Sequence, residues 1–178
     1  MNNTMALEDV DSIVSGVIEG HEKLGLVAMV GSAITSREFR EKIFEFERSL
    51  ARIPNSFVGD SDQCPLKHSF ANGIYVREIF LPKGVLLTGR IHKCDHPNFI
   101  LSGDVSVVTE FDGVQRLKAP QSMISKAGTK RLVYAHADTV WVTIHRTDET
   151  DPSKLVDEIT VGTYEEFNRI SERLQLCQ

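Results

Sequence analysis

The spacing of apolar residues divides the chain into a helical first third and a longer region of short strands. From Leu7 to Leu24, apolar residues recur every three or four positions, which predicts an amphipathic helix. A second helix is predicted to begin at the capping residue Ser36 and to end before Pro54. Its apolar positions are Phe39, Ile43, Phe46 and Leu50. The small apolar segment Leu24–Ile34 between the two helices fits a buried helix or a strand.

From Asn72 the period of the apolar positions changes to two, which predicts about eight short strands. Glycine, proline and aspartate separate these strands, and Asp112-Gly113 is typical of a hairpin turn. So many short strands predict a closed sandwich or barrel, because an open sheet would leave its edges unprotected. The predicted strands are Ile74–Leu81, Val85–His92, Phe99–Leu101, Val105–Phe111, Val114–Leu117, Met123–Ser125, Arg131–His136 and Thr139–Arg146.

Residues 54–66 are rich in proline, glycine, asparagine and aspartate, and we expect a loop there. Two short helices are predicted after Arg146, and an acidic run is expected to cap the first of them. That run contains Asp148, Glu149 and Asp151. The apolar positions of the two helices are Leu155, Val156 and Ile159, and Phe167, Ile170 and Leu174.

The composition is that of a globular protein, with 178 residues, 41% hydrophobic and 25% charged. A net charge of -5 spread along the chain argues against nucleic acid polymers and anionic membranes as partners. The apolar segment Leu24–Ile34 is too short to span a bilayer. Three widely spaced cysteines, Cys64, Cys94 and Cys177, are typical of a reduced compartment, so we expect a cytoplasmic protein.

Several short motifs resemble the paired glycine-centred motifs of cupins. They are Pro82-Lys83-Gly84, His92, Ile100-Leu101-Ser102-Gly103-Asp104-Val105 and Lys126-Ala127-Gly128. The stretch from Cys64 to Asp151 is more closely similar to small single-domain cupin-like proteins of tailed bacteriophages and prophages. That likeness lies in Cys64-Pro65, His68, Gly73 to Glu78, Gly89 to Lys93, Ala127 to Arg131 and Thr139 to His145.

The resemblance implies an α+β protein built on a cupin-type double-stranded β-helix barrel, or jelly roll. We expect an N-terminal helical segment at 1–63, the barrel at 64–147 and C-terminal helices at 148–178, forming one compact unit. A phage origin would place the protein in the host cytoplasm. Cupins often dimerise, and the apolar N-terminal helices offer a surface for this. The resemblance implies no particular reaction.

Many cupins bind a divalent metal through His-x-His, a following Glu and a later His, and this sequence departs from that pattern. His92 takes the first histidine position, but the second falls at Cys94. His96 stands where the glutamate is usual, and Arg131 stands at the later histidine position. The usual metal set is therefore incomplete.

Strand alternation suggests other ligands, because residues two apart share one face of a strand. Thr88, Arg90 and His92 share a face, as do Trp141, Thr143 and His145, and as do Tyr134 and His136. His92, His96 and His145 are therefore candidate ligands for Fe, Mn, Ni or Zn, with His136 as a further candidate. The alternative is a metal-free protein in which these faces are solvated and His96 belongs to a turn.

A small anionic or aromatic ligand, such as a nucleotide, is expected at the mouth of the barrel. The alternative is that its cations pair with the excess carboxylates of the chain. The candidate ligand-binding residues are Arg77, Arg90, Lys130, Arg131, Tyr134, Trp141 and Thr143.

The leading functional hypothesis is a cupin-like protein that binds a small ligand or a metal. As an enzyme, it would hold the metal at His92 and its partners, orient an anionic substrate with Arg90 or Arg131 and donate a proton from Tyr134. One alternative is a non-catalytic protein that sequesters a nucleotide-type host defence signal. Another is a structural or host-interaction protein that uses the barrel as a scaffold. GxSxG, P-loop, HExxH and GxGxxG motifs are absent from the sequence, which removes the usual support for hydrolases, NTPases, zincins and dinucleotide-binding folds.

Overall fold

Two antiparallel sheets make up most of the computed structural model, which describes residues 36–52, 56 and 60–175. In order across it, the larger sheet contains β1 (Leu66–Ala71), β2 (Ile74–Leu81), β10 (Thr139–Arg146), β5 (His96–Ser102) and β8 (Gln121–Ser125). The smaller one contains β3 (Leu86–Thr88), β9 (Arg131–Ala135), β6 (Asp104–Thr109) and β7 (Gly113–Lys118). A short two-stranded sheet joins β4 (Ile91–His92) to β11 (Thr160–Val161).

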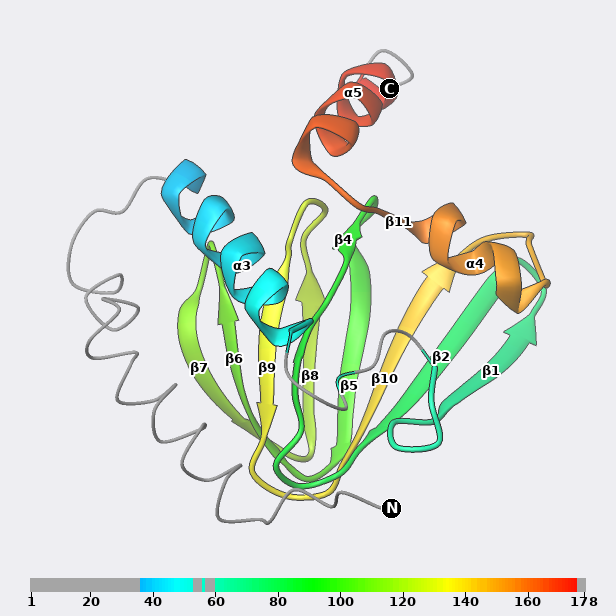
Figure 1. Cartoon of the computed structure of the whole chain (residues 1–178). Coiled ribbons are helices and arrows are strands. Elements are labelled where there is room, and N and C mark those ends of the chain that lie inside the picture. Colours follow the sequence, from blue (N-terminus) through cyan, green and yellow to red (C-terminus); the bar gives the residue numbers. More distant parts are fainter. Residues whose placement is uncertain (1–35, 53–55, 57–59, 176–178) are drawn as a thin grey trace.

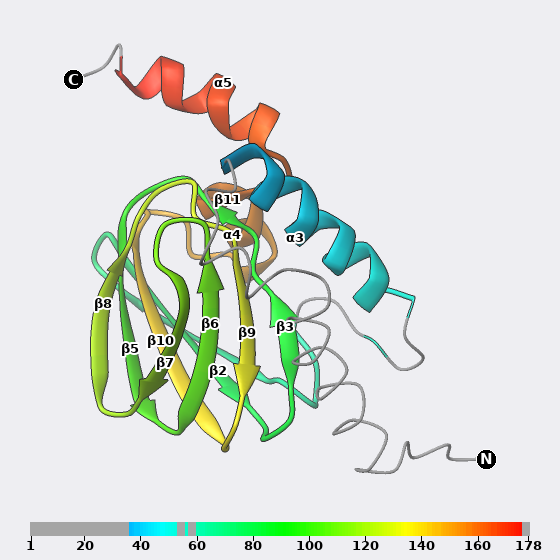
Figure 2. The same cartoon turned by 90° about the vertical axis from the view of Figure 1, so that its left-hand side faces the viewer.

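The strand order is that of a jelly roll. β2 pairs with β10, β3 with β9, β5 with β8 and β6 with β7, so the chain behaves like a long hairpin rolled into two facing sheets. Figures 1 and 2 show this arrangement from two sides. The expected α+β class and cupin-type double-stranded β-helix are confirmed. Within the described chain, the strand pairings form two separate main sheets, a sandwich instead of a closed barrel.

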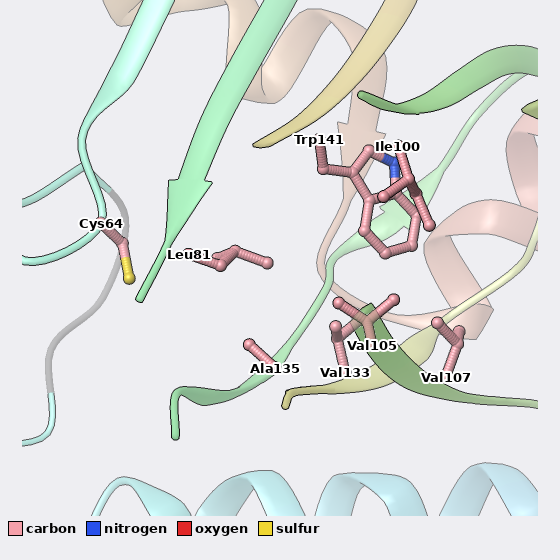
Figure 3. Packing of buried hydrophobic residues seen from close by; sticks show 8 residues of the cluster. All are labelled: Cys64, Leu81, Ile100, Val105, Val107, Val133, Ala135 and Trp141. Atoms are coloured by element: carbon pink, nitrogen blue, oxygen red, sulfur yellow. The ribbon is translucent and has the colours of Figure 1, made fainter. Parts of the chain in front are cut away.

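The hydrophobic core lies between the two sheets, as Figure 3 shows. Alternation along each strand places one set of side chains inward, because successive residues point to opposite faces. The larger sheet contributes Leu81, Ile100 and Trp141, and the smaller one contributes Val105, Val107, Val133 and Ala135. Cys64, just before β1, closes one side of this cluster.

Helix α3 (Ser36–Leu50) packs on the outer face of the smaller sheet (Figure 1). Phe39 and Ile43 contact Val108 and Leu132, whose neighbours along the strands point into the core. The predicted second helix is thus present, and its apolar spacing fits its packing. The helix expected over Leu7–Leu24 and the segment Leu24–Ile34 lie outside the described residues.

Helices α4 (Pro152–Ile159) and α5 (Tyr164–Gln175) follow the last long strand, β10, and β11 connects them. Asp151 caps α4 by accepting a hydrogen bond from the backbone N–H of Ser153 at 3.0 Å, as the acidic run predicted. Tyr164 of α5 packs with Ile91 and Val161, so α5 lies against the short β4–β11 sheet. No helix in the described part of the chain is long and apolar enough to cross a membrane.

Two glycines of the cupin-like motifs occupy positions where a side chain would not fit. Gly103 has a φ of 102°, and an added Cβ would lie 2.1 Å from Thr139 Oγ1. Gly128 has a φ of 81°, and its Cβ would lie 2.9 Å from the Phe167 ring. Gly103 therefore permits a close turn against β10, and Gly128 permits the close approach of α5.

The sequence prediction differs from the structure among the strands, most clearly at β3 and β4, at β1 and at the short β11. The predicted strand Val85–His92 is divided into β3 and β4, because its first half pairs with β9 and its second half with β11. Strand β1 was not predicted, since its first residue fell in the expected loop at 54–66.

Candidate metal centre

The inner face of the larger sheet changes from apolar to polar along its strands. Ile79, Trp141 and Ile100 form an apolar row across β2, β10 and β5. The next row of the same face contains Arg77, Thr143 and Asn98. Beyond it lie Tyr75 on β2, His145 on β10 and His96 on β5. Three adjacent strands therefore bring polar side chains together at one end of the sandwich.

His92 lies on β4, at the polar end of the sandwich. Strand β11, which connects α4 to α5, pairs with β4 and holds it in place. Thr160 of β11 pairs with His92, and the Lys93 N–H donates to the Ile159 carbonyl at 3.0 Å. The Gly128 N–H donates to the carbonyl of His92 itself at 2.9 Å. The backbone of His92 is thus fixed on two sides.

The imidazoles of His92, His96 and His145 form a close trio. Their ring centroids are 4.1 Å apart for His92 and His96, 4.6 Å for His96 and His145, and 5.1 Å for His92 and His145. One ring nitrogen of each lies within 4.8 Å of those of the other two. His96 and His145 are buried and His92 is partly buried.

Two nitrogens of the trio are available to a ligand. His96 Nδ1 lies 3.1 Å from the Cys94 carbonyl, and because a carbonyl only accepts, this nitrogen carries the proton. His96 Nε2 is therefore a free lone pair; it is buried and has no hydrogen-bond partner among the described residues. His92 Nδ1 is likewise buried without such a partner. His145 Nε2 lies 3.0 Å from the Thr143 hydroxyl.

Burial lowers the pKa of all three histidines, because an imidazolium loses its hydration there. The pKa of His96 falls to about 4 and that of His145 to about 3, and the pKa of His92 is well below its usual value. The positive charge of Arg131 lowers all three further. The trio is therefore neutral at pH 7, which is the form that binds metals.

Asn98 links the trio to the opposite sheet. Its Oδ1 accepts hydrogen bonds from Trp141 Nε1 and Arg131 Nη1, both at 3.1 Å. Its Nδ2 donates to the His96 carbonyl at 3.0 Å and to Ser125 Oγ at 2.8 Å. Arg131 Nη2 also donates to Ser125 Oγ. This network fixes the backbone of His96 and the guanidinium of Arg131 in the interior.

Of the expected ligand-binding residues, the structure brings Arg77, Arg131, Trp141 and Thr143 to this end of the interior. Arg90 instead contacts α4 and β11, through Asp157 and Thr160. Lys130 is buried against α3, where its Nζ lies 2.9 Å from Glu47 Oε1.

Tyr134 and His136 lie on the outer face of the smaller sheet, because Val133 and Ala135, which alternate with them, point inward. His136 Nε2 contacts Ser106 Oγ at 2.7 Å. The expected convergence of His136 with the other histidines is therefore wrong. Tyr134 is also not positioned to donate a proton at the trio.

Sequence reasoning missed Tyr75 and Asn98. Tyr75 is 1% exposed; its ring stacks on His145, and its hydroxyl lies 2.8 Å from His68 Nδ1. Asn98 is fully buried. Strand alternation offered a signal for both, since Tyr75 shares a face with Arg77, and Asn98 shares one with His96.

The donor set fits a divalent transition metal. Three neutral imidazoles suit Fe, Mn, Ni and Zn, and leave coordination positions open. Ligand nitrogens around a tetrahedral ion with bonds of about 2.1 Å are roughly 3.4 Å apart. The ligand nitrogens of the three histidines lie at most 4.8 Å apart, so the side chains need to move only slightly closer to bind one ion. The Cys94 carbonyl that accepts from His96 is the type of second partner that orients metal-binding histidines.

Several solved structures are similar to this chain at low sequence identity. A cupin superfamily protein from Desulfitobacterium hafniense is 12% identical, covering 52% of this chain and 84% of its own, with a TM-score of 0.42. An RmlC-like cupin from Methanocaldococcus jannaschii is 14% identical, covering 56% and 92%, with a TM-score of 0.42.

The DMSP lyase DddQ from Ruegeria pomeroyi is 17% identical, with a TM-score of 0.45. The match covers 55% of this chain and 55% of the lyase. No protein-family profile and no curated protein sequence matches the chain. At these identities the likeness concerns the fold alone.

Proposed function

We propose that this cupin-fold protein binds one divalent transition metal ion through His92, His96 and His145 and takes a small ligand beside the ion. The observation that carries the proposal is the pair of buried nitrogens, His92 Nδ1 and His96 Nε2, that lack partners among the described residues. A buried polar atom without a hydrogen bond is costly, and a metal ion would satisfy both nitrogens.

A bound ion would supply Lewis-acid chemistry, polarising an oxygen of the ligand. The protein's own residues would orient that ligand and limit its access to water. Arg131 is fixed by Asn98 and Ser125, and Trp141 forms an apolar wall beneath it. The donor set suits Fe, Mn, Ni and Zn alike.

Elemental analysis of the full chain after reconstitution with each of these metals tests the proposal. We expect about one ion per chain in the wild type, since the three histidines form one site. A His92→Ala/His145→Ala double variant is expected to lose the ion. His136→Ala is the matched control and keeps it, because His136 lies on the outer face of the smaller sheet.

Circular dichroism establishes that each variant folds, and His145→Asn provides a milder substitution if the double variant does not. Metal content well below one ion in the reconstituted wild type would overturn the proposal. Undiminished metal in a folded double variant would overturn the assignment to these histidines.

The biological setting is also a proposal and rests on the sequence resemblance. We infer a phage or prophage protein that acts in the host cytoplasm as a homodimer. Exposed apolar side chains on the outer face of the larger sheet support the dimer, namely Phe80, Leu101 and Ile124. Light scattering on the purified chain gives the oligomeric state directly. A monomer at micromolar concentration would overturn the proposed homodimer.

Two other functions would use the same molecule differently. A sequestering protein would bind a nucleotide-type signal at equilibrium and return it unchanged, whereas a metal-dependent enzyme would turn its ligand over. A scaffold protein would need neither metal nor ligand. Recovery of an added nucleotide after incubation with the metal-loaded chain separates the first two.

A further inference from the structure

Arg131 carries a positive charge in the interior without a neighbouring negative one. Its side chain belongs to a residue that is 9% exposed, and its hydrogen bonds reach the neutral oxygens of Asn98 and Ser125. The guanidinium carbon lies 5.5 Å from the centre of the Trp141 ring. None of these neighbours neutralises the charge.

Arg77 lies on the same inner face, next to Thr143, and is half-buried. Its nearest charged neighbours include Asp60, which acts on it from beyond ion-pair distance. Within the described ranges, no carboxylate oxygen lies within 4.0 Å of either Arg77 or Arg131. Arg90, Arg116 and Lys130 differ from these two arginines, since each has a carboxylate partner.

The two arginines act on one another and on the histidine trio. The charge of Arg77 helps lower the pKa of Arg131 to about 10, after the larger effect of burial. Both arginines also lower the pKa of His92 and His145. Arg77 also lies opposite Thr143, one row along the inner face from His145, so the two cations act on the same end of the interior as the three neutral rings.

Such an arrangement is unfavourable without an anion. Removing a charge from water costs several kcal/mol unless a counter-charge or good hydrogen bonds replace the lost hydration. A divalent ion on the histidines would add two further positive charges. The trio contains no carboxylate to offset them, because all three members of the cluster are histidines.

We infer that this site takes a small oxyanion, a carboxylate or a phosphate, held by Arg77 and Arg131 beside the histidine trio. The inference rests on the proposed function for the metal, and on the two unpaired arginines for the anion. Guanidinium groups bind such anions in a bidentate manner through paired N–H donors. An oxygen of the same anion could complete the coordination of the ion.

The position of Arg131 makes the inference specific. It stands three residues after Gly128, where the cupin motifs usually carry a histidine ligand. Here the fold places a cation in that position, directed at Asn98 and Ser125. The guanidinium of Arg131 is thus held in the interior, where its charge would attract an external anion.

Cobalt provides the readout, because the visible spectrum of protein-bound Co²⁺ responds to a change in its coordination. The full chain is loaded with Co²⁺ and titrated with acetate, with inorganic phosphate and with acetamide as the uncharged control. We expect a saturable spectral change with an anion and none with acetamide. A response to acetate but not phosphate indicates a carboxylate site, and the reverse indicates a phosphate site. Either result supports the inference.

Arg77→Met is expected to weaken the anion response at least tenfold while Co²⁺ still binds. Arg116→Met is the matched control, because Arg116 belongs to the same sandwich but pairs with Asp104, and it should respond like the wild type. Arg131→Lys keeps the charge but removes the paired donors, and it should weaken the response without loss of folding. An unchanged response in Arg77→Met, or an equal response to acetamide, overturns the inference.

The two proposals fail separately. If Co²⁺ binds but no anion alters its spectrum, the anion site is wrong and the metal site stands. If Co²⁺ does not bind, the metal site is wrong, and the anion is then tested through the melting temperature of the metal-free chain. If acetate or phosphate raises the melting temperature of the wild type but not that of Arg77→Met, the anion site is supported. If neither anion raises the melting temperature of the wild type, the anion site is wrong.

Discussion

A histidine can bind a metal only through a nitrogen that is not already protonated, so the environment of each ring decides what the trio can do. The Cys94 carbonyl fixes the proton of His96 on Nδ1 and directs the lone pair of Nε2 into the interior. Burial then keeps the rings neutral. The backbone and the solvent exclusion together prepare the site before any ion arrives.

The same burial predicts how the stability of the metal-free protein depends on pH. In the unfolded chain these histidines have a pKa of about 6.5, whereas His96 and His145 in the folded protein have values of about 4 and 3. Below pH 6.5 the unfolded state therefore binds protons that the folded state does not. The free energy of unfolding should therefore decrease as the pH is lowered below 6.5, by up to about 1.4 kcal/mol per pH unit for each histidine.

Urea denaturation of chelator-treated protein between pH 8 and pH 4 measures this dependence. Stability should be constant above pH 7 and decrease from about pH 6.5 downward, with the decrease ending near the folded pKa values. His145→Asn should flatten the profile, and His136→Asn should change it less. A profile that is level from pH 7 to pH 4.5 would contradict the assignment of buried neutral histidines.

The sequence predicted the meeting of His92, His96 and His145 better than the positions of the candidate cations. Strand alternation put His145 beside Trp141 and Thr143 on the inner face, and the motif position of His92 was informative. Alternation could not tell which face of β9 is inward, so Tyr134 and His136 were expected on the wrong side. Lys130 and Arg90 could not be assigned either, because their partners lie on α3 and α4.

Among the elements, the short β4–β11 pair has the largest influence on the site. β11 lies between two helices, and it holds the strand that carries His92. Val161 is 1% exposed and packs with Ile91 and Tyr164, so the helix α5 also supports this strand. The position of His92 thus depends on β11 and on the helices that flank it, α4 and α5.

Shortening Val161 should therefore loosen the metal site. Val161→Ala is expected to lower metal affinity about tenfold, as is typical when the support of a ligand is lost. Val107→Ala is the matched control, because Val107 is also buried but belongs to the core between the sheets. Both should lose about 2 kcal/mol of stability. Equal metal affinity in the two variants, measured by competition with a chromophoric chelator, would refute a supporting role for β11.

Most of the elements were predictable from local pattern, but their partners were not. Ile74–Leu81 and Thr139–Arg146 alternate clearly, and their predicted bounds match β2 and β10. Strand β11 is only two residues long, too short for any periodicity. Its signal was compositional, since Ile159, Thr160 and Val161 are β-branched and suit a strand. The division of Val85–His92 depends on pairing with β11 and so had no local signal.

For the whole molecule, a metal ion would cross-link β10 to β4 and β5, which lie far from it in the sequence. His92 lies on β4, His96 on β5 and His145 on β10. These positions meet only in the folded chain, so the ion should bind the folded state alone. Free metal at about 1,000 times its dissociation constant would then stabilise the protein by about 4 kcal/mol.

For a chain of this size that stabilisation corresponds to a rise in melting temperature of roughly 10 °C. Differential scanning calorimetry with and without metal measures the rise, and a chelator should reverse it. The His92→Ala/His145→Ala variant should show no rise. A rise of the same size in that variant would mean that the metal stabilises the fold through other residues.

The rolled-hairpin order of the strands also has a consequence for how fast the molecule forms. Ile74 pairs with Arg146, whereas Thr109 pairs with Gly113, so the hairpin tip can form early and the closing pair must wait for almost the whole sandwich. Topologies dominated by such distant pairings fold in milliseconds to seconds, far more slowly than helical bundles. His145 lies on the closing strand, so the histidine trio is assembled at the end of folding. A nascent or partly folded chain would therefore lack the complete trio, and binding of the proposed metal ion would report that folding is finished.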